Sequence, residues 1–425
     1  MAACRQTFST GGRLFAALLI FTSLTAAQPT EKTIWSFAGA PRDGSFPRAG
    51  LVPGLGDAFF GVTPYGGSGP CTNATFGPGC GAVFSLTPAW TEAVIYSFPS
   101  EAEPRTALTF APGNVLYGTT AFGGTFNQGT VFSMNPPSSS GGAWTEATLY
   151  SFTGDSDGGA IASSVVIDGS TGVLYGVTGQ GGTSNKGTVY SLTPPAAAGG
   201  AWTETVLYNF TGAPTDGSGP TGVTIGGGGV LYGTTGVGGA ASAGTVFSLT
   251  PPASAGGSWT EQIIHNFGAS EDGQLPSSGV VSGAGGVLYG TTLSGGSAGV
   301  GTVFALQPPA SPGSPWTETV IHNFAGSESG DGASPSSPVI IGNHGVVFGT
   351  TRTGGIGNDY GTVFALTPPA AAGDPWAETI LWSFTAGADG LDPTGGVVFG
   401  PGELLFGATQ GGGSAALGTA FYVKP

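Results

Sequence analysis

The chain has 425 residues, of which only 8% are charged, and its formal net charge at pH 7 is −15. So acidic a chain is not expected to bind nucleic acid or an anionic membrane surface. Its 82 glycines and 32 prolines would suit a disordered chain, but 39% of the residues are hydrophobic and recur at fixed spacing, so we expect an ordered protein rich in turns.

The first 27 residues have the pattern of a secretory signal peptide. Arg5 and Arg13 are followed by the apolar stretch 14–24 and then by small residues up to Ala27. The apolar stretch is shorter than the roughly 20 residues that a membrane-spanning helix needs. We therefore expect a signal peptide of residues 1–27, no transmembrane segment in the mature chain, and a secreted or extracellular protein, with the periplasm or the cell surface as alternatives.

Residues 28–425 are expected to form a single domain, because they carry seven copies of a repeat of about 58 residues. An aromatic residue followed by Gly marks each copy, in steps of 57 to 59 residues, at Phe60, Tyr117, Tyr175, Tyr232, Tyr289, Phe348 and Phe406. The clearest copy contains Trp202-Thr-Glu-Thr-Val-Leu-Tyr-Asn-Phe210, Asp216-Gly217, Gly229-Val-Leu-Tyr-Gly-Thr-Thr235 and Gly244-Thr-Val-Phe-Ser-Leu-Thr-Pro-Pro252. A tandem array of this period predicts a solenoid or a propeller.

Each copy contains four short segments that are rich in β-branched and aromatic residues and end at Gly or Pro, as strands do. The segments are apolar on both faces, which is typical of blades packed between two neighbours. No segment after Ala27 has a helical pattern. The sequence therefore predicts an all-β fold, a seven-bladed β-propeller of four-stranded blades, with an open or β-helical stack as the alternative.

The two ends of the repeat array complement each other. Residues 29–37 match the Trp-Thr-Glu strand of the other copies, whereas the last copy ends at residues 418–425 without that strand. We expect the N-terminal strand to complete the C-terminal blade and so close the ring, because closure removes an open sheet edge.

Cys71 and Cys80 bracket an insertion in the first repeat. In an oxidising compartment two cysteines this close in sequence are expected to form a disulfide that closes the loop. A metal site is the alternative, but it needs more ligands than two cysteines.

The repeated phrases Val-Leu-Tyr-Gly-Thr-Thr, Gly-Thr-Val-Phe-Ser-Leu-Thr-Pro-Pro and Trp-Thr-Glu resemble the GloVer repeat of secreted bacterial proteins, described as choice-of-anchor tandem-repeat proteins. The resemblance covers residues 29–425 and implies an exported repeat protein of uncharacterised activity. The family name refers to varied surface anchors, and none is visible in this chain. The repeat is more loosely similar to kelch propellers, but Gly-Thr-Thr stands in place of the kelch glycine doublet, so that similarity concerns the fold alone.

Two acidic positions recur in the repeat. One is a glutamate in all seven copies (Glu31, Glu92, Glu146, Glu204, Glu261, Glu318 and Glu378), and the other an aspartate in six (Asp43, Asp157, Asp216, Asp272, Asp331 and Asp389). Gly follows each of these aspartates, which is typical of a turn in which Asp accepts hydrogen bonds from its own backbone and Gly adopts a positive φ. Calcium binding is the alternative, but one carboxylate per blade falls short of the six to eight oxygens that calcium takes.

Other candidate residues also fall into repeat positions. His265 and His322 occupy a slot held elsewhere by Trp or Tyr and are expected to act as flat packing groups, whereas His344 is expected in an exposed turn. A tryptophan recurs at the start of one strand, at Trp90, Trp144, Trp202, Trp259, Trp316 and Trp376. Blade-to-blade packing is the favoured role of these rings, and stacking on sugars is the alternative.

No catalytic motif stands out, so we expect no catalytic residue, cofactor or metal. The hypothesis that the protein is an enzyme is the less favoured one. The leading hypothesis is an exported, non-enzymatic repeat scaffold that binds an unknown protein or glycan. A polysaccharide-active hydrolase or lyase is one alternative, with carboxylates taken from the residues outside the repeat pattern: Asp57, Asp155, Asp168, Asp359, Asp374 and Asp392. A structural component of a cell surface or matrix is the other.

Overall fold

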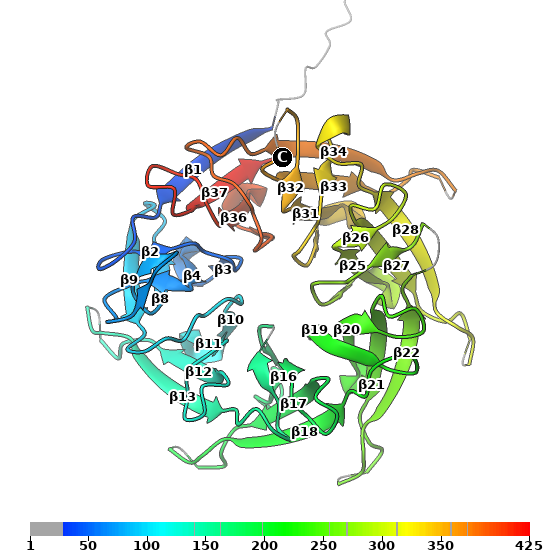
Figure 1. The fold of residues 1–425 in the computed structure, drawn as a ribbon, viewed down its shortest axis with the longest axis horizontal. Helices are drawn as coiled ribbons and strands as arrows, with labels where there is room; N and C mark the ends of the chain where they lie inside the picture. The colour runs from blue at the N-terminus through cyan, green and yellow to red at the C-terminus, as the bar shows by residue number, and fades with distance from the viewer. Residues whose placement is uncertain are drawn as a thin grey trace, which may run out of the picture.

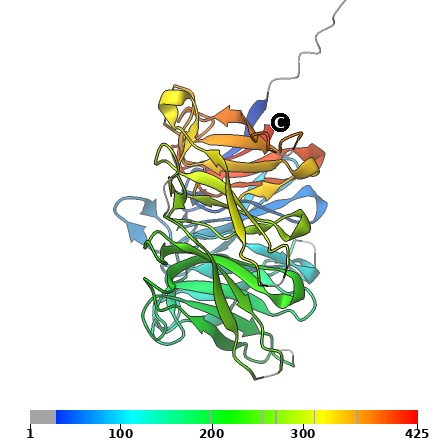
Figure 2. The same ribbon diagram turned by 90° about the vertical axis from the view of Figure 1, so that its right-hand side faces the viewer.

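The structure, a computed structural model, describes residues 29–425 except 140, 162, 198, 255, 269, 270, 312, 358 and 372. The expected signal peptide, residues 1–27, lies outside the described residues. The described strands form seven four-stranded antiparallel blades arranged in a ring, which confirms the seven-bladed β-propeller (Figure 1). Figure 2 shows the ring from the side, with the blades adjacent to one another around it.

Blades 1 to 4 follow one another along the chain, and each begins at the axis and ends at the rim. From the axis outward, blade 1 contains β3 (Val52–Pro53), β4 (Phe59–Thr63), β8 (Ala82–Leu86) and β9 (Glu92–Ser97), and blade 2 contains β10 (Thr109–Ala111), β11 (Val115–Thr120), β12 (Thr130–Asn135) and β13 (Thr145–Ser151). In blade 3, β14 (Gly159–Ile161) and β15 (Val166–Ile167) share the innermost place, followed by β16 (Leu174–Gln180), β17 (Thr188–Thr193) and β18 (Thr203–Asn209). Blade 4 contains β19 (Gly217–Ile225), β20 (Leu231–Gly238), β21 (Thr245–Thr250) and β22 (Thr260–Asn266).

Blades 5 to 7 continue the same order. They comprise β24 (Val281–Ser282), β25 (Leu288–Thr292), β27 (Thr302–Gln307) and β28 (Thr317–Asn323); β30 (Ile340–Ile341), β31 (Val347–Thr351), β33 (Thr362–Thr367) and β34 (Ala377–Ser383); and β35 (Val397–Phe399), β36 (Leu405–Thr409), β37 (Thr419–Lys424) and β1 (Thr30–Ser36). Blade 7 therefore takes its outer strand from the N-terminal end of the described chain.

Short elements lie in the connections. Two-residue strands pair as β2 (Gly44–Ser45) with β5 (Tyr65–Gly66), β6 (Thr72–Asn73) with β7 (Gly77–Pro78), β23 (Gly273–Gln274) with β26 (Ser294–Gly295), and β29 (Gly332–Ala333) with β32 (Thr353–Gly354). The described helices are single 3-10 turns: η1 (Leu55–Asp57), η2 (Pro112–Asn114), η3 (Gly227–Gly229), η4 (Ala284–Gly286), η5 (Ser327–Ser329), η6 (Asn343–Gly345) and η7 (Pro401–Glu403). No described helix is long and apolar enough to cross a membrane.

The ring closes as the chain ends predict. Strand β1 pairs antiparallel with β37, from Thr30 opposite Lys424 to Ser36 opposite Thr419. The backbone amide of Phe37 donates to the carbonyl of Gly418 at 3.0 Å, which extends the pairing by one residue. The outer edge of the last blade is thus occupied by the first strand, and the predicted closure is confirmed.

Aromatic residues pack between and within the blades. The recurring tryptophans contact the aromatic residue of the Tyr-Gly motif in the preceding blade, as Trp202 does with Tyr117, whose ring centroid lies 6.0 Å away. Blade-to-blade packing, the favoured role of these tryptophans, is confirmed. The glycine of the same motif faces a buried ring: a Cβ added at Gly233 would lie 2.5 Å from the Phe247 ring. The glycine is therefore required by close packing.

Candidate functional site

The connections between strands divide the molecule into two faces. Because successive strands of a blade are antiparallel, the connections from one blade to the next share a face with the loops between second and third strands. Hydrogen bonds join these two kinds of connection: Phe122 donates its amide to the carbonyl of Ala102, and Arg352 donates its amide to the carbonyl of Ser334. We call this side of the ring the entry face.

A pocket of about 340 Å³ lies on the axis of the ring, because residues from all seven blades line it. This axial pocket reaches the lower end of the range of about 300–1,000 Å³ that is usual for small-molecule sites. The described residues that line it include no Asp or Glu, and most are small or carry hydroxyl groups. The exceptions in size and charge are Arg48 and Arg105.

These two arginines occupy one position of the repeat. A proline near the end of the connection into six of the seven blades packs on the last glycine of a neighbouring loop, as Pro47 does on Gly418 and Pro104 on Gly81, whereas Ile161 takes this place in blade 3. The residue that follows this proline lines the axial pocket. That residue is an arginine in blades 1 and 2, whereas in blades 4 to 7 it carries a hydroxyl: Thr221, Ser277, Ser336 and Thr394.

The arginine pair is poorly neutralised. The Nε atoms of Arg48 and Arg105 are both buried, and neither has a hydrogen-bond partner among the described residues. Burial lowers the pKa of Arg105, and the positive charge of Arg48 lowers it further, so the two guanidinium groups repel each other. Arg105 forms an ion pair with Glu103, but no ion pair to Arg48 is found in the described part of the chain.

A third arginine lies close to this pair. Arg352 donates from Nε to Oδ1 of Asp392 at 3.0 Å, and burial raises the pKa of Asp392 while Arg352 and then Arg48 oppose that shift. Only seven basic residues follow Ala27 in a chain with 24 acidic ones. Three of these seven basic residues thus lie close together on the entry face, at or near the axial pocket, which makes this region locally cationic.

Large apolar side chains are exposed on the entry face. Phe122, Phe126, Leu275, Ile356 and Tyr360 lie in connections of that face and Val237 lies near the end of β20 that leads into one, whereas Leu55 lies on the opposite face. Phe126 is 55% exposed and Ile356 is 68% exposed. Six of the seven exposed large apolar side chains among the described residues therefore lie on the entry face.

The insertion in the first repeat also lies near the pocket. The sulfur atoms of Cys71 and Cys80 are bonded, with their Cα atoms 5.0 Å apart, so the bond closes the hairpin formed by β6 and β7. Phe76 of this hairpin stacks on Tyr65 with ring centroids 4.6 Å apart, and the Arg48 guanidinium lies 5.7 Å from the Phe76 ring centre. The hairpin therefore supports Arg48 through a cation–π contact.

A second cluster of ionisable residues lies nearer the rim, at the junctions between blades. Six of the seven junctions combine an aromatic residue or histidine from the outer strand of one blade, the recurring aspartate of the following turn, and the recurring glutamate of the next outer strand. At the junction of blades 3 and 4, for example, the Tyr208 hydroxyl donates to Oδ2 of Asp216 at 3.1 Å, and Glu261 lies nearby. We call each such trio a junction set.

The recurring aspartates are buried turn residues, as predicted. Asp216 accepts hydrogen bonds from the amides of Thr211 and Gly217, at 2.7 and 2.6 Å. The prediction for the following glycine was wrong in most blades, because a positive φ is found only at Gly158 and Gly390. Elsewhere the reason is space, since a Cβ at Gly217 would lie 2.4 Å from the Thr235 side chain.

The recurring glutamates carry raised pKa values. Burial raises the pKa of Glu204 to about 7, and the negative charge of Asp157 adds to the shift. The same two causes raise the pKa of Glu92 to about 8, with Asp43 as its neighbour, and that of Glu261 to about 7, with Asp216. These glutamates face a second carboxylate across the blade junction, so a proton or a cation there relieves repulsion.

The histidines behave as flat packing groups and also take part in the junction sets. His265 packs edge-on against Phe267 at 4.7 Å between ring centroids, like Tyr208 against Phe210. Its Nε2 lies 3.2 Å from Oδ2 of Asp272, a contact that the sequence pattern did not predict. His344 lies in η6, in a connection at the opposite face.

The six aspartates proposed for a hydrolase or lyase do not converge. Three lie in connections of the entry face (Asp155, Asp359 and Asp392), and three lie in connections of the opposite face (Asp57, Asp168 and Asp374). None of the six is among the described residues that line the axial pocket. Asp392 is paired with Arg352, and Asp168 accepts hydrogen bonds from Ser170 within its own turn.

Sequence reasoning did not single out Arg48 or Arg105. The signal was present, because the residue after the entry proline is Ser or Thr in four copies and Arg in two. The role of this position follows only from the ring, which brings these residues of six blades together around a common axis.

Comparison with known proteins supports the repeat assignment. The model of the Gloeobacter/Verrucomicrobia repeat matches residues 70–304 and 254–425. The chain belongs to this repeat family. The resemblance to the GloVer repeat is thus confirmed for the repeat itself, and no curated protein matches the chain in sequence.

Solved structures share the fold with this member of the repeat family at low sequence identity. A putative 6-phosphogluconolactonase from Bacteroides uniformis is 14% identical with a TM-score of 0.50, covering 85% of this chain and 89% of that one. A protein of unknown function from Dyadobacter fermentans is 12% identical with a TM-score of 0.44, covering 82% and 96%. A putative glucose dehydrogenase from Thermus thermophilus is 12% identical with a TM-score of 0.41, covering 83% and 99%. At 14% identity the likeness to the first of these structures concerns the fold alone and carries no activity to this chain.

Proposed function

We propose that this propeller is an exported binding scaffold that takes the acidic end or side group of a carboxylated saccharide into its axial pocket. One observation carries the proposal: Arg48 and Arg105 both line the pocket, and their buried Nε atoms find no hydrogen-bond partner among the residues that the structure describes. Bound anions relieve repulsion of this kind, and the planar guanidinium group binds carboxylates through paired hydrogen bonds.

The rest of the entry face suits a sugar better than a simple anion. Hydroxyl side chains of the five other blades line the same pocket and can exchange hydrogen bonds with sugar hydroxyls. Exposed aromatic rings, Phe122, Phe126 and Tyr360, lie in loops of the same face and offer flat surfaces to a chain that leaves the pocket. Export is supported by the pattern of residues 1–27 and by the paired Cys71 and Cys80.

The test is calorimetric titration of the tag-free mature chain with galacturonate oligomers, with malto-oligomers as the neutral comparison. We expect binding of the acidic oligomer alone, weakened by salt. The double variant R48S/R105S places at these positions the hydroxyl that other blades carry, and we expect it to lose at least about tenfold in affinity with its fold intact.

The matched control is R42S, which removes an exposed arginine of the same charge outside the pocket. Equal binding of neutral and acidic oligomers, or equal loss in R42S and in the double variant, would contradict the proposal. Release of shorter oligosaccharides from the bound probe would point instead to catalysis.

A further inference from the structure

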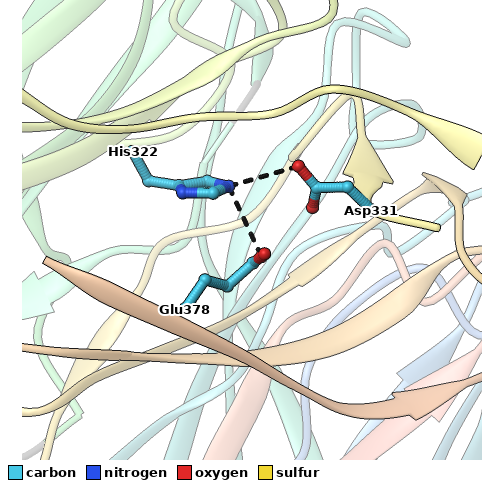
Figure 3. Close-up of side chains that lie close together, drawn as sticks. All are labelled: His322, Asp331 and Glu378. Atoms are coloured by element: carbon cyan, nitrogen blue, oxygen red, sulfur yellow. Dashed lines mark ion pairs between the residues drawn. The ribbon is translucent and has the colours of Figure 1, made fainter. Parts of the chain in front are cut away.

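The junction between blades 5 and 6 differs from the others in the atoms that meet there. Strand β28 of blade 5 contributes His322, the connection into blade 6 contributes Asp331, and strand β34 of blade 6 contributes Glu378 (Figure 3). Among the described residues this is the one group of three His, Cys, Asp or Glu side chains whose donor atoms all lie within 4.8 Å of one another.

The distances match those between the ligands of a tetrahedral metal ion. Nε2 of His322 lies 3.4 Å from Oδ2 of Asp331 and 3.4 Å from Oε1 of Glu378. Ligands about 2.0–2.1 Å from a zinc ion in tetrahedral geometry are separated by about 3.3 Å. The third pair, a carboxylate oxygen of Asp331 and one of Glu378, lies within 4.8 Å.

Two of the three side chains also have polar atoms that make no hydrogen bond and are available to bind a cation. Nε2 of His322 and Oε1 of Glu378 are buried, and neither makes a hydrogen bond within the described part of the chain. The amides of Ala325 and Gly332 donate to the two oxygens of Asp331, at 2.8 and 2.5 Å, and hold that carboxylate in place. The three side chains point toward one another, with the His322 ring nitrogen facing an oxygen of each carboxylate (Figure 3).

The repeat itself shows what histidine changes at this position. Where Tyr or Trp stands in the slot, as at Tyr208, the ring only donates a hydrogen bond to the aspartate. Imidazole can instead offer a lone pair, which makes it the commonest protein ligand of zinc. His265 of the preceding junction is near Asp272 and Glu318, but the donor atoms of those three residues do not all lie within 4.8 Å of one another, as those of the His322 set do.

We propose that His322, Asp331 and Glu378 bind a divalent transition metal ion such as zinc, which fastens blade 5 to blade 6. One histidine nitrogen and two carboxylate oxygens form three ligands, and water takes the fourth position. The three side chains remain 12 to 18% exposed, so solvent reaches part of each of them although the facing donor atoms are buried.

The test is titration of the tag-free, chelator-treated mature chain with zinc chloride at pH 7.5, followed by calorimetry. We expect one equivalent to bind with micromolar or tighter affinity, and the melting temperature to rise until that equivalent is reached. Cobalt(II) in place of zinc is expected to give the strong visible absorption of a tetrahedral site. Binding should weaken at pH 5, where protons compete for the three ligands.

The His322→Tyr variant removes the metal ligand and keeps the fold, because Tyr150 and Tyr208 occupy the same slot in blades 2 and 3. We expect it to lose at least about tenfold in zinc affinity, and Glu378→Gln to lose affinity as well. His265→Tyr, the matched control one blade earlier, should bind zinc as the unaltered chain does. No binding by the unaltered chain, or equal affinities for the two histidine variants, overturns the proposal.

Discussion

The junctions between blades and the segments that reach the axis come from the same repeat, but they vary differently. At the junctions a Glu recurs in every blade and the Asp of the turn in six of seven. At the axis, by contrast, equivalent positions hold Arg in two adjacent blades and Ser or Thr in four others. Residues that recur in every blade hold the ring together, whereas the departures from the repeat make one side of the axial pocket cationic.

The strongest way to break the common architecture is to remove the strand that closes the ring. A chain that begins at Ala38 lacks β1 and leaves the edge of β37 unpaired in blade 7. We expect aggregation or loss of cooperative unfolding, because an exposed sheet edge pairs with other chains. Circular dichroism melting and size-exclusion chromatography would show it, with a chain beginning at Pro29 as the control. An unchanged melting temperature would refute closure by β1.

The junction sets predict a large but smaller loss when one aspartate is removed. Asp216 is buried and accepts hydrogen bonds from two backbone amides and from the Tyr208 and Thr211 hydroxyls. In Asp216→Ala these donors lose their acceptor, which we expect to cost about 2–4 kcal/mol in the free energy of unfolding. Denaturant unfolding measures the change.

Asp374→Ala serves as the control for that loss, because Asp374 is exposed. A comparable loss of stability in both variants would show that the junction aspartate has no special structural role. Saccharide binding by Asp216→Ala at low temperature should stay near that of the unaltered chain, since the junction lies away from the axial pocket. This outcome would separate the two regions functionally.

The packing of the second strands predicts an intermediate effect. A Cβ at Gly290 would lie 2.5 Å from the Phe304 ring, so Gly290→Ala forces the ring or the strand to move. Overpacking of this kind costs about 1–3 kcal/mol. Gly227→Ala, where a Cβ meets nothing within 4 Å, is the control and should change the melting temperature little. Equal melting temperatures for the two variants would contradict the packing argument.

The fold could be predicted almost completely because the same strand and turn pattern recurs in every copy of the repeat. Strand segments such as 203–209 recur at fixed spacing, and the missing strand of the last copy matched residues 29–37, so both blade number and closure followed from the sequence. The axial pocket could not be found in the same way. Arg48 and Arg105 are 57 residues apart in the chain and come together only because the ring brings neighbouring blades to one axis.

The junction contacts were hidden for a related reason. The sequence placed the aspartates in turns and the histidines among packing groups, and both placements were right. It could not show that Asp331 and His322 contact each other, or that Glu378 of the next blade joins them, because these contacts depend on how blades pack. The distance from the aromatic slot to the aspartate oxygen also varies between junctions, from 3.0 Å at Tyr150 and Asp157 to 3.4 Å at His322 and Asp331, which no sequence pattern encodes.

The smallest predicted effect is on pH dependence, and it distinguishes a junction glutamate from an ordinary surface acid. The pKa of Glu204 is about 7 in the folded chain and 4.5 as its ordinary value, so the folded protein retains a proton that the unfolded chain has lost between those values. Stability from this group is therefore full at low pH and falls as pH rises from about 4.5 to 7. Glu31 and Glu261, also with pKa values of about 7, add to the same slope.

Glu204→Gln removes the charge that forms at higher pH while keeping the shape of the side chain. We expect it to leave stability at pH 5 nearly unchanged and to raise it at pH 8 by about 1 kcal/mol at most, because the group is half exposed and solvent screens its interaction with Asp157. Melting temperatures of both chains from pH 5 to pH 8 test this, with Asp374→Asn as the exposed control. A destabilisation of equal size at both pH values would mean that the Glu204 carboxylate stabilises the junction by hydrogen bonding, and that repulsion from Asp157 is not its main interaction.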